Sequence, residues 1–314
     1  MPVGQMRTVF NLEKARTRTA IVLVLPLLSF VALFYFLDIS DLVYVTSSLS
    51  IGTFLAIGIV STLRPLFGGL RSSLAFRPIA NLSLVDATKG YVLSAYGSIF
   101  LPSAVGGDLL RIEHMKNVTG TSRAESFLVA ATERVLGLFS LVFLTACLFI
   151  FDVPFSLPWH WLTAVFVSGC ILFLLSKFVL NSTDENSLFN RTLTYIRTYA
   201  NSKMLMGAFG LSVLFQIVSL SVPVMVAYDL AGLDAAFMIA LITPAIALFS
   251  TLPISVGGIG LREASYVGTG ALLNLDESVC LISGLALSMS VILSGVPGVF
   301  IQSDLLTANR YENE

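Results

Sequence analysis

The chain has 314 residues, of which 56% are hydrophobic and 12% are charged, with a formal net charge of −1 and a mean hydropathy of +0.88. A soluble globular domain carries roughly 25% charged residues, so this composition excludes an ordinary soluble protein. We therefore expect an all-α polytopic membrane protein in which residues 1–314 form a single membrane domain. Nothing in the composition predicts a nucleic-acid partner.

Long apolar runs mark the expected membrane helices. Each run approaches or exceeds the ~18 residues that a transmembrane helix needs. The first run is longer than the core of a typical signal peptide, and no A-x-A site follows it, so we expect a retained helix. About six transmembrane helices are predicted, over residues 20–37, 42–63, 126–151, 159–180, 204–229 and 279–300.

Charged residues between these runs predict the topology. Lys and Arg precede the first run, follow the second, precede the third and follow the fourth. On this interpretation Arg64, Arg71 and Arg77 belong to the connection after the second helix. The other connections contain acids but no Lys or Arg. The positive-inside rule therefore places both termini and the basic connections on the cytoplasmic side of the cytoplasmic (inner) membrane.

One phrase occurs twice. "LPSAVGGDLLR" at 101–111 and "LPISVGGIGLR" at 252–262 share seven of eleven residues, and each follows a further apolar stretch, at 86–101 and 237–252. Both flanks of the first are basic and both flanks of the second are acidic, so each predicts a helical hairpin that re-enters the side it came from. A kink in a continuous helix is the alternative. The residues expected to break the helices are Pro102, Gly106, Gly107, Pro253, Gly257, Gly258 and Gly260.

The order of elements then reads as two copies of one unit: helix, helix, re-entrant hairpin, helix. The first copy covers about 20–151 and the second about 159–300, in opposite orientations. Chance similarity between two turns rich in proline and glycine is the alternative. Inverted repeats with broken helices are typical of transporters, whose substrate site lies at the repeat interface.

The residues after each glycine pair predict an anion site. A restarted helix presents free N–H groups, which attract phosphate. Arg111 and Arg262 follow the second glycine by four residues and add bidentate donors suited to phosphate or carboxylate. Asp108 either caps the first restarted helix or pairs with Arg111. The candidate substrate-binding residues are Arg111, Arg262, Asp108, Glu133, Arg134 and Glu263.

Glu133 and Arg134 interrupt an apolar run. A charge at mid-bilayer costs about 2.5–3.5 kcal/mol, so both need partners or water. Neighbouring residues on a helix point in different directions, so we expect Glu133 to reach Arg111, or Arg134 to reach an acid near a hairpin. These charges either serve function or form a structural network, and the same question applies to Glu263. No catalytic motif, metal site or cofactor is predicted.

Three phrases carry a family resemblance. In this order, "FLPSAVGGDLLRIEHM", "ATERVLGL" and "LPISVGGIGLREASYV" resemble the membrane region of lysylphosphatidylglycerol synthases and its stand-alone, flippase-like relatives. The resemblance implies motif positions at the helix-breaking and substrate-binding residues named above. Only about fourteen residues follow the last apolar run, so a stand-alone member without the soluble synthase domain is expected. Lysyl-lipid is therefore not assumed as the substrate.

The expected function is a lipid flippase. It would move an anionic phospholipid or a polyprenyl-linked lipid between leaflets, with Arg111 and Arg262 holding the head-group phosphate. The alternative is an intramembrane enzyme or an accessory subunit of a lipid-linked glycosylation pathway, with a glycosyltransferase or lipid-modifying enzyme as partner. Transport of small anions is a third possibility. The lack of catalytic motifs favours a transporter over a transferase.

Overall fold

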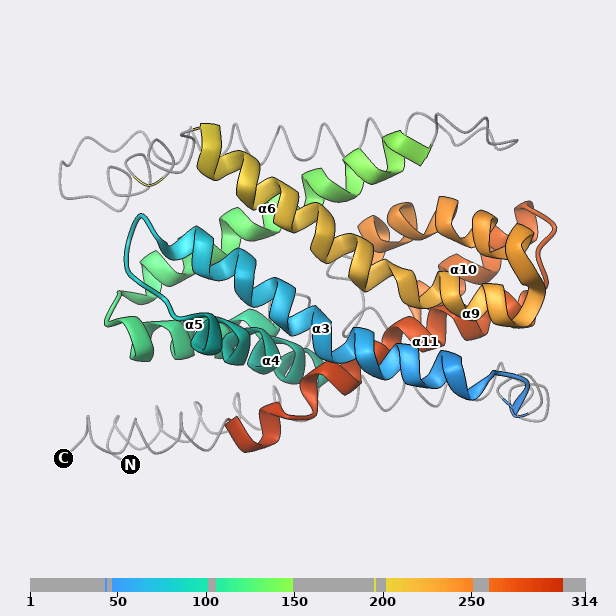
Figure 1. The fold of residues 1–314 in the computed structure, drawn as a ribbon, viewed down its shortest axis with the longest axis horizontal. Coiled ribbons are helices and arrows are strands. Elements are labelled where there is room, and N and C mark those ends of the chain that lie inside the picture. The colour runs from blue at the N-terminus through green and yellow to red at the C-terminus, as the bar shows by residue number, and fades with distance from the viewer. Residues whose placement is uncertain are drawn as a thin grey trace, which may run out of the picture.

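The computed structural model describes residues 47–100, 106–148, 202–250 and 260–301, together with residues 43 and 195. Within these ranges helices are the only regular secondary structure (Figure 1). Two predicted helices, at 20–37 and 159–180, and the predicted breaks Pro102, Pro253, Gly257 and Gly258 lie outside them. The described helices are α3 (Ile51–Phe76), α4 (Leu84–Phe100), α5 (Gly106–Thr119), α6 (Arg123–Leu148), α9 (Ser202–Ser250), α10 (Leu261–Leu272) and α11 (Glu277–Gly295).

Four of these helices, α3, α6, α9 and α11, are long and apolar enough to cross a membrane. The beginnings of several helices are fixed by short polar side chains. Ser50 Oγ accepts from the N–H of Thr53 at the start of α3, and Asp276 Oδ1 accepts from the N–H of Val279 at the start of α11. Such caps satisfy backbone donors that have no partner inside the helix.

The second predicted helix ends later than the charges indicated. The helix α3 continues through Arg64 and Arg71 to Phe76, so the prediction that these two arginines lie in a cytoplasmic connection is wrong. Only Arg77, the exposed residue at its end, fits that interpretation. The physical reason is that α3 packs closely on α4 here: a Cβ at Gly68 or Gly69 would overlap α4. Both arginines therefore lie inside the helical bundle.

The helices α4 and α5 form an antiparallel hairpin. Close to their connection, Gly107 lies against the carbonyl of Ser94. Farther away, His114 Nε2 lies 3.1 Å from the carbonyl oxygen of Asp86. The sequence separation of the contacting residues grows with distance from the connection, as it does between antiparallel arms. The start of α4 and the end of α5 therefore lie at the same end of the molecule.

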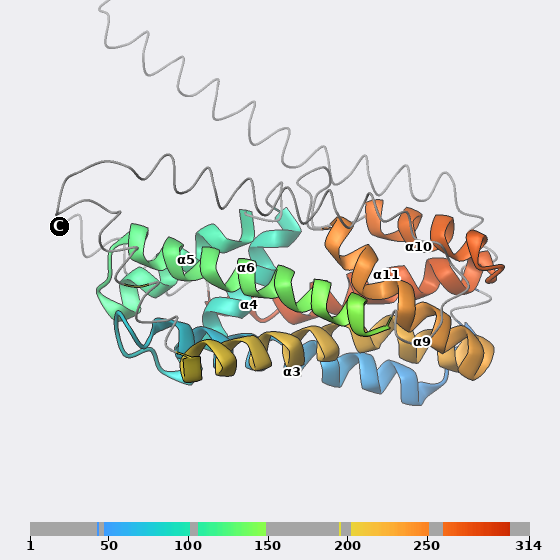
Figure 2. The ribbon, with the colours of Figure 1, turned by 90° about the horizontal axis from the view of Figure 1, so that it is seen from above.

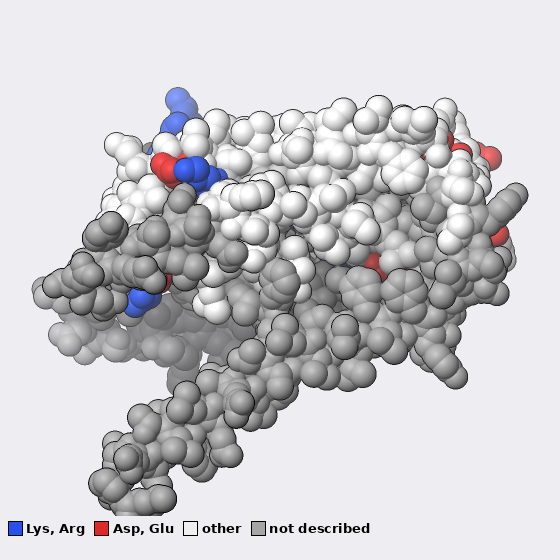
Figure 3. Space-filling view, turned by 90° about the horizontal axis from the view of Figure 1, so that it is seen from below, with Lys and Arg blue, Asp and Glu red and all other residues white. Residues whose placement is uncertain are grey.

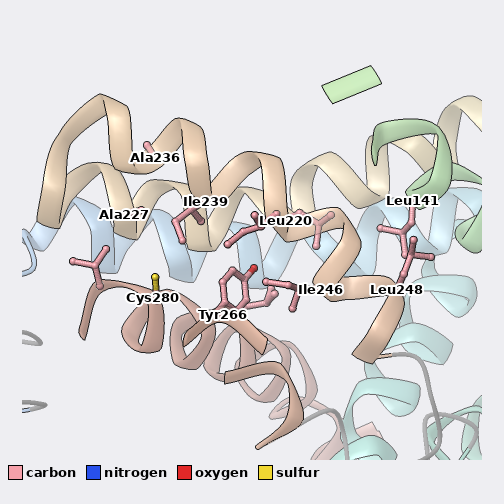
Figure 4. Packing of buried hydrophobic residues seen from close by; sticks show 12 residues of the cluster. Leu141, Leu220, Ala227, Ala236, Ile239, Ile246, Leu248, Tyr266 and Cys280 are labelled. Carbon is pink, nitrogen blue, oxygen red and sulfur yellow. The ribbon is translucent and has the colours of Figure 1, made fainter. Parts of the chain in front are cut away.

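A second hairpin follows the break in α9. Gly232 has a φ of 81°, a left-handed conformation that glycine adopts without strain, and it divides α9 into two helical segments. The second segment pairs with α10, where Thr243 Oγ1 and the Tyr266 hydroxyl lie 2.9 Å apart. Tyr266 is fully buried beside Ile239 and Ile246 (Figure 4).

The two hairpins extend from opposite ends of the bundle. Both views place α4 with α5 at one end and α10 with the second segment of α9 at the other (Figures 1 and 2). The long helices α3, α6 and the first segment of α9 run along the molecule between them. On the face shown in Figure 3, Lys and Arg gather at the end where α3 finishes, only acids mark the opposite end, and the described surface between is nearly all uncharged.

A glycine-mediated contact joins α11 to the first hairpin. A Cβ at Gly295 would lie 2.7 Å from the backbone nitrogen of Tyr96 in α4, so no side chain fits between the two backbones. Gly298 meets the side chain of the same tyrosine. Small residues allow this close approach between membrane helices.

Candidate functional site

A cavity of about 400 Å³ is lined by residues of both hairpins. Its walls come from α3, α4, α5, α6, α9, α10 and α11. Five of the six predicted substrate-binding residues line it: Asp108, Arg111, Glu133, Arg134 and Arg262. The structure thus brings together residues that lie up to 154 positions apart in the chain, and their role in substrate binding stays a prediction.

Arg111 is the centre of a buried ion-pair network. Its Nη1 donates to Glu133 Oε2 at 2.6 Å, and its Nη2 lies 3.3 Å from Asp108 Oδ1. The guanidinium also stacks over Tyr91, with its central carbon 4.7 Å from the ring centroid. All these groups are almost completely buried except the half-buried Tyr91. The expected contacts from Arg111 to Glu133 and to Asp108 are both present.

Arg134 occupies a different side of α6 from its neighbour Glu133. Its Nε donates to Asp108 Oδ2 at 2.5 Å, as expected for an arginine that reaches an acid of a hairpin. Asp108 also accepts from the hydroxyl of Ser94 at 3.0 Å. Asp108 therefore links α4, α5 and α6 through side-chain contacts rather than capping α5, which begins two residues earlier at Gly106.

Glu263, the sixth predicted residue, does not line the cavity. Its Oε2 accepts from the backbone N–H of Gly260 at 2.6 Å, and its Oε1 accepts from the hydroxyl of Ser288 at 2.5 Å. The carboxylate thus satisfies a free donor at the start of α10, where Gly260 has a φ of 84°. Arg262, one residue earlier, points to the cavity and donates to Ser288 at 2.8 Å.

The sequence analysis missed two arginines and a tyrosine of the cavity, Arg64, Arg71 and Tyr91, as well as its serines and Gln216. Arg71 Nη2 donates to the Tyr91 hydroxyl at 2.5 Å, and that hydroxyl donates to Glu133 Oε2 at 3.2 Å. Arg64 and Arg71 are seven residues apart, which places them on one face of a helix. That spacing could have indicated two arginines on the inner face of a helix. It was not used, because both residues had been assigned to a connection.

The cavity is electrically positive. The described residues that line it include five arginines and only two carboxylates, Asp108 and Glu133. Its polar lining also contains Ser94, Ser98, Gln216, Ser219 and Ser250. Among the described residues, no group of three or more His, Cys, Asp or Glu side chains could hold a metal ion. The arrangement is suited to binding an anion by charge and hydrogen bonds.

Apolar helices around a charged internal cavity define a multi-pass helical membrane protein, because buried charge is tolerated in membranes only inside the bundle. Residues 18–298 match the family described as the lysylphosphatidylglycerol synthase TM region, and the chain belongs to that family. The resemblance noted from three phrases is thereby confirmed over most of the chain. No curated protein matches the chain.

Proposed function

We propose that this protein moves an anionic lipid, a phospholipid or a polyprenyl-linked lipid, between the leaflets of the cytoplasmic membrane. The observation that carries the proposal is the arginine-rich cavity that both hairpins line. Five arginines against two carboxylates favour a negatively charged occupant. The family supports a membrane function, and the anion chemistry of the cavity supports a phosphate-bearing head group.

The proposed topology is an inverted repeat with two re-entrant hairpins. The helices α4 and α5 have 17 and 14 residues. At ~1.5 Å per residue they are about 25 Å and 21 Å long, shorter than the ~30 Å hydrocarbon core. A hairpin of this length enters the membrane and returns. Both termini are proposed to lie in the cytoplasm, on the side where the described surface carries Lys and Arg (Figure 3).

The cavity has the size of a head-group site. Its volume of about 400 Å³ falls at the lower end of the ~300–1,000 Å³ range of ligand pockets. We propose that the polar head group occupies it while the acyl or prenyl chains stay in the bilayer. Exposure of the cavity first to one side and then to the other would carry the head group across.

Liposomes containing the purified protein test this proposal. Fluorescent phosphatidylglycerol and fluorescent polyprenyl phosphate are placed in both leaflets, and dithionite added outside reports how fast inner-leaflet lipid appears. Arg111→Gln and Arg262→Gln should each slow translocation at least 10-fold, whereas Arg123→Gln, at an exposed position, should not. Undiminished translocation by the double variant Arg111→Gln, Arg262→Gln would refute the role of the cavity.

The same preparations separate the alternative functions. Product formed by the purified protein from a lipid acceptor and a nucleotide-sugar donor would favour an intramembrane enzyme. A glycan defect that depends on a partner glycosyltransferase, with no translocation by the protein alone, would favour an accessory subunit.

A further inference from the structure

Two buried polar atoms of the cavity have no hydrogen-bond partner among the described residues and belong to no ion pair there. They are Arg64 Nη1 and Ser219 Oγ. Arg71 Nε and Glu133 Oε1 also lack hydrogen bonds, but they lie 3.9 Å apart and compensate each other as an ion pair. A buried donor without an acceptor is costly, so these two atoms indicate where an occupant supplies an acceptor.

Arg64 and Ser219 both line the cavity, from two helices that pack on each other. The central carbon of the Arg64 guanidinium lies 5.8 Å from the centroid of the Phe215 ring. Phe215 and Ser219 are four residues apart in α9 and therefore lie on the same face of that helix. Contact with an aromatic ring attracts a guanidinium but leaves its charge uncompensated.

Arg262 and Arg64 line the same cavity, so their like charges act on each other. Two guanidinium groups that face one cavity repel each other, and the repulsion is stronger where water is scarce. A phosphate between them would replace repulsion with two charge-assisted interactions. Arginine is well suited to this role because its planar donors match phosphate oxygens.

Arg111 and Arg134, on the other side of the cavity, already have carboxylate acceptors. Carboxylate oxygens lie 2.6 Å from Arg111 Nη1 and 2.5 Å from Arg134 Nε. Binding a phosphate at Arg111 would require competition with Glu133, a carboxylate that is completely buried. The cavity therefore has a compensated side, where Asp108 and Glu133 lie, and a cationic side, lined by Arg64 of α3, Ser219 of α9 and Arg262 of α10, where the described lining contains no carboxylate.

We infer that a phosphate group binds on the cationic side, between Arg64 and Arg262, with the Ser219 hydroxyl as a further donor. This inference rests on the proposed function and names the site of the head-group phosphate. Arg111 then acts as a positioning residue that holds the hairpin and α6 together. The source of the phosphate is a lipid head group, and free phosphate is the other source with the same chemistry.

Binding measurements on the full chain in nanodiscs without anionic lipid test the inference. Three probes are compared: dihexanoylphosphatidylglycerol, dihexanoylglycerol, which lacks the phosphate, and inorganic phosphate. Arg64→Gln should weaken binding of the phosphatidylglycerol about 10-fold or more. Ser219→Ala should weaken it by about 2–10-fold. Binding of dihexanoylglycerol should not change in either variant.

Arg77→Gln, at the exposed position that follows the same helix, is the matched control and should bind as the unsubstituted protein does. Thermal unfolding without ligand provides a check on folding. Arg64→Gln should unfold at no lower temperature than the unsubstituted protein, because the substitution removes an uncompensated buried charge. Ser219→Ala tests the same phosphate site independently, because it removes a hydrogen-bond donor without changing the charge.

Unchanged affinity for dihexanoylphosphatidylglycerol in a folded Arg64→Gln protein would overturn the inference. Equal loss in Arg64→Gln and Arg77→Gln would also overturn it, since only long-range charge would then matter. Phosphate binding that depends on Arg64, in a protein that translocates no lipid, would support the site and refute the flippase. Translocation with an unchanged apparent lipid affinity in Arg64→Gln would leave the flippase standing and refute the site.

Discussion

Substitution of Arg111 by glutamine should destabilise the protein much more than substitution of any other cavity arginine. The glutamine would leave Glu133 and Asp108 buried beside each other with one positive charge fewer. Breaking a buried ion pair by removing one partner costs about 3–5 kcal/mol. Glu133 would still accept from Tyr91, so the lower end of that range, about 3 kcal/mol, is expected.

The measurement is thermal unfolding of the detergent-solubilised protein. At ~2 °C per kcal/mol, Arg111→Gln should lower Tm by about 6 °C. The double variant Arg111→Gln, Glu133→Gln should recover at least half of that loss, because it removes both charges of the pair. Arg123→Gln, which breaks an exposed ion pair to Glu113, should lower stability by at most about 1 kcal/mol.

A double variant less stable than Arg111→Gln would show that the two side chains do not act as a pair. Equal Tm values for Arg111→Gln and Arg64→Gln would contradict the division of the cavity into a compensated and a cationic side. Both results can be obtained without any knowledge of the transported lipid.

Three further predictions follow from the fold. Gly107→Ala should destabilise the first hairpin by about 1–3 kcal/mol because its Cβ would overlap the α4 backbone; Gly58→Ala, in open space, should not, as thermal unfolding would show. Glu263→Ala should lower Tm while leaving the affinity for phosphatidylglycerol unchanged. A loss of affinity in the folded variant would instead place Glu263 in the binding site. In a cysteine-free background, Ser122→Cys should react with an impermeant maleimide only from the cytoplasmic side and Glu277→Cys only from outside; labelling of just one of the two from the opposite side would refute the re-entrant topology.

Local sequence signals predicted the paired helices on either side of the first repeated phrase and the ion pairs; that the hairpins re-enter the membrane stays a prediction. Proline and paired glycines in an apolar stretch predict a break in the helix, and an intramembrane acid requires a cation within reach. Glu133 pairs with Arg111 and Arg134 pairs with Asp108, an acid of the first hairpin, as expected, because few charged candidates were available. The helix boundaries at 84–100 and 106–119 also lie close to the predicted first hairpin.

The extent of α3 could not be predicted in the same way. Arginine after an apolar run usually marks the membrane surface. The positive-inside rule counts every such arginine as part of a connection, whether or not it is buried in the bundle. Arg64 and Arg71 are inside the helix because α4 and α9 supply Tyr91, Ser212 and Phe215 as partners. Those partners lie 20 or more residues away in the chain, so only the tertiary fold reveals them.

The contact of Gly295 and Gly298 with Tyr96 has a consequence for how relatives of this protein vary. Along α11, Met289 and Leu293 are 53% and 42% exposed, and side chains of many sizes fit there. At Gly295, even one methyl group would push two backbones apart. An alignment of family members should therefore show apolar residues of varied size at 289 and 293, with glycine retained at 295. Within this one helix, the exposed positions are therefore expected to change rapidly in evolution and the position packed against α4 slowly.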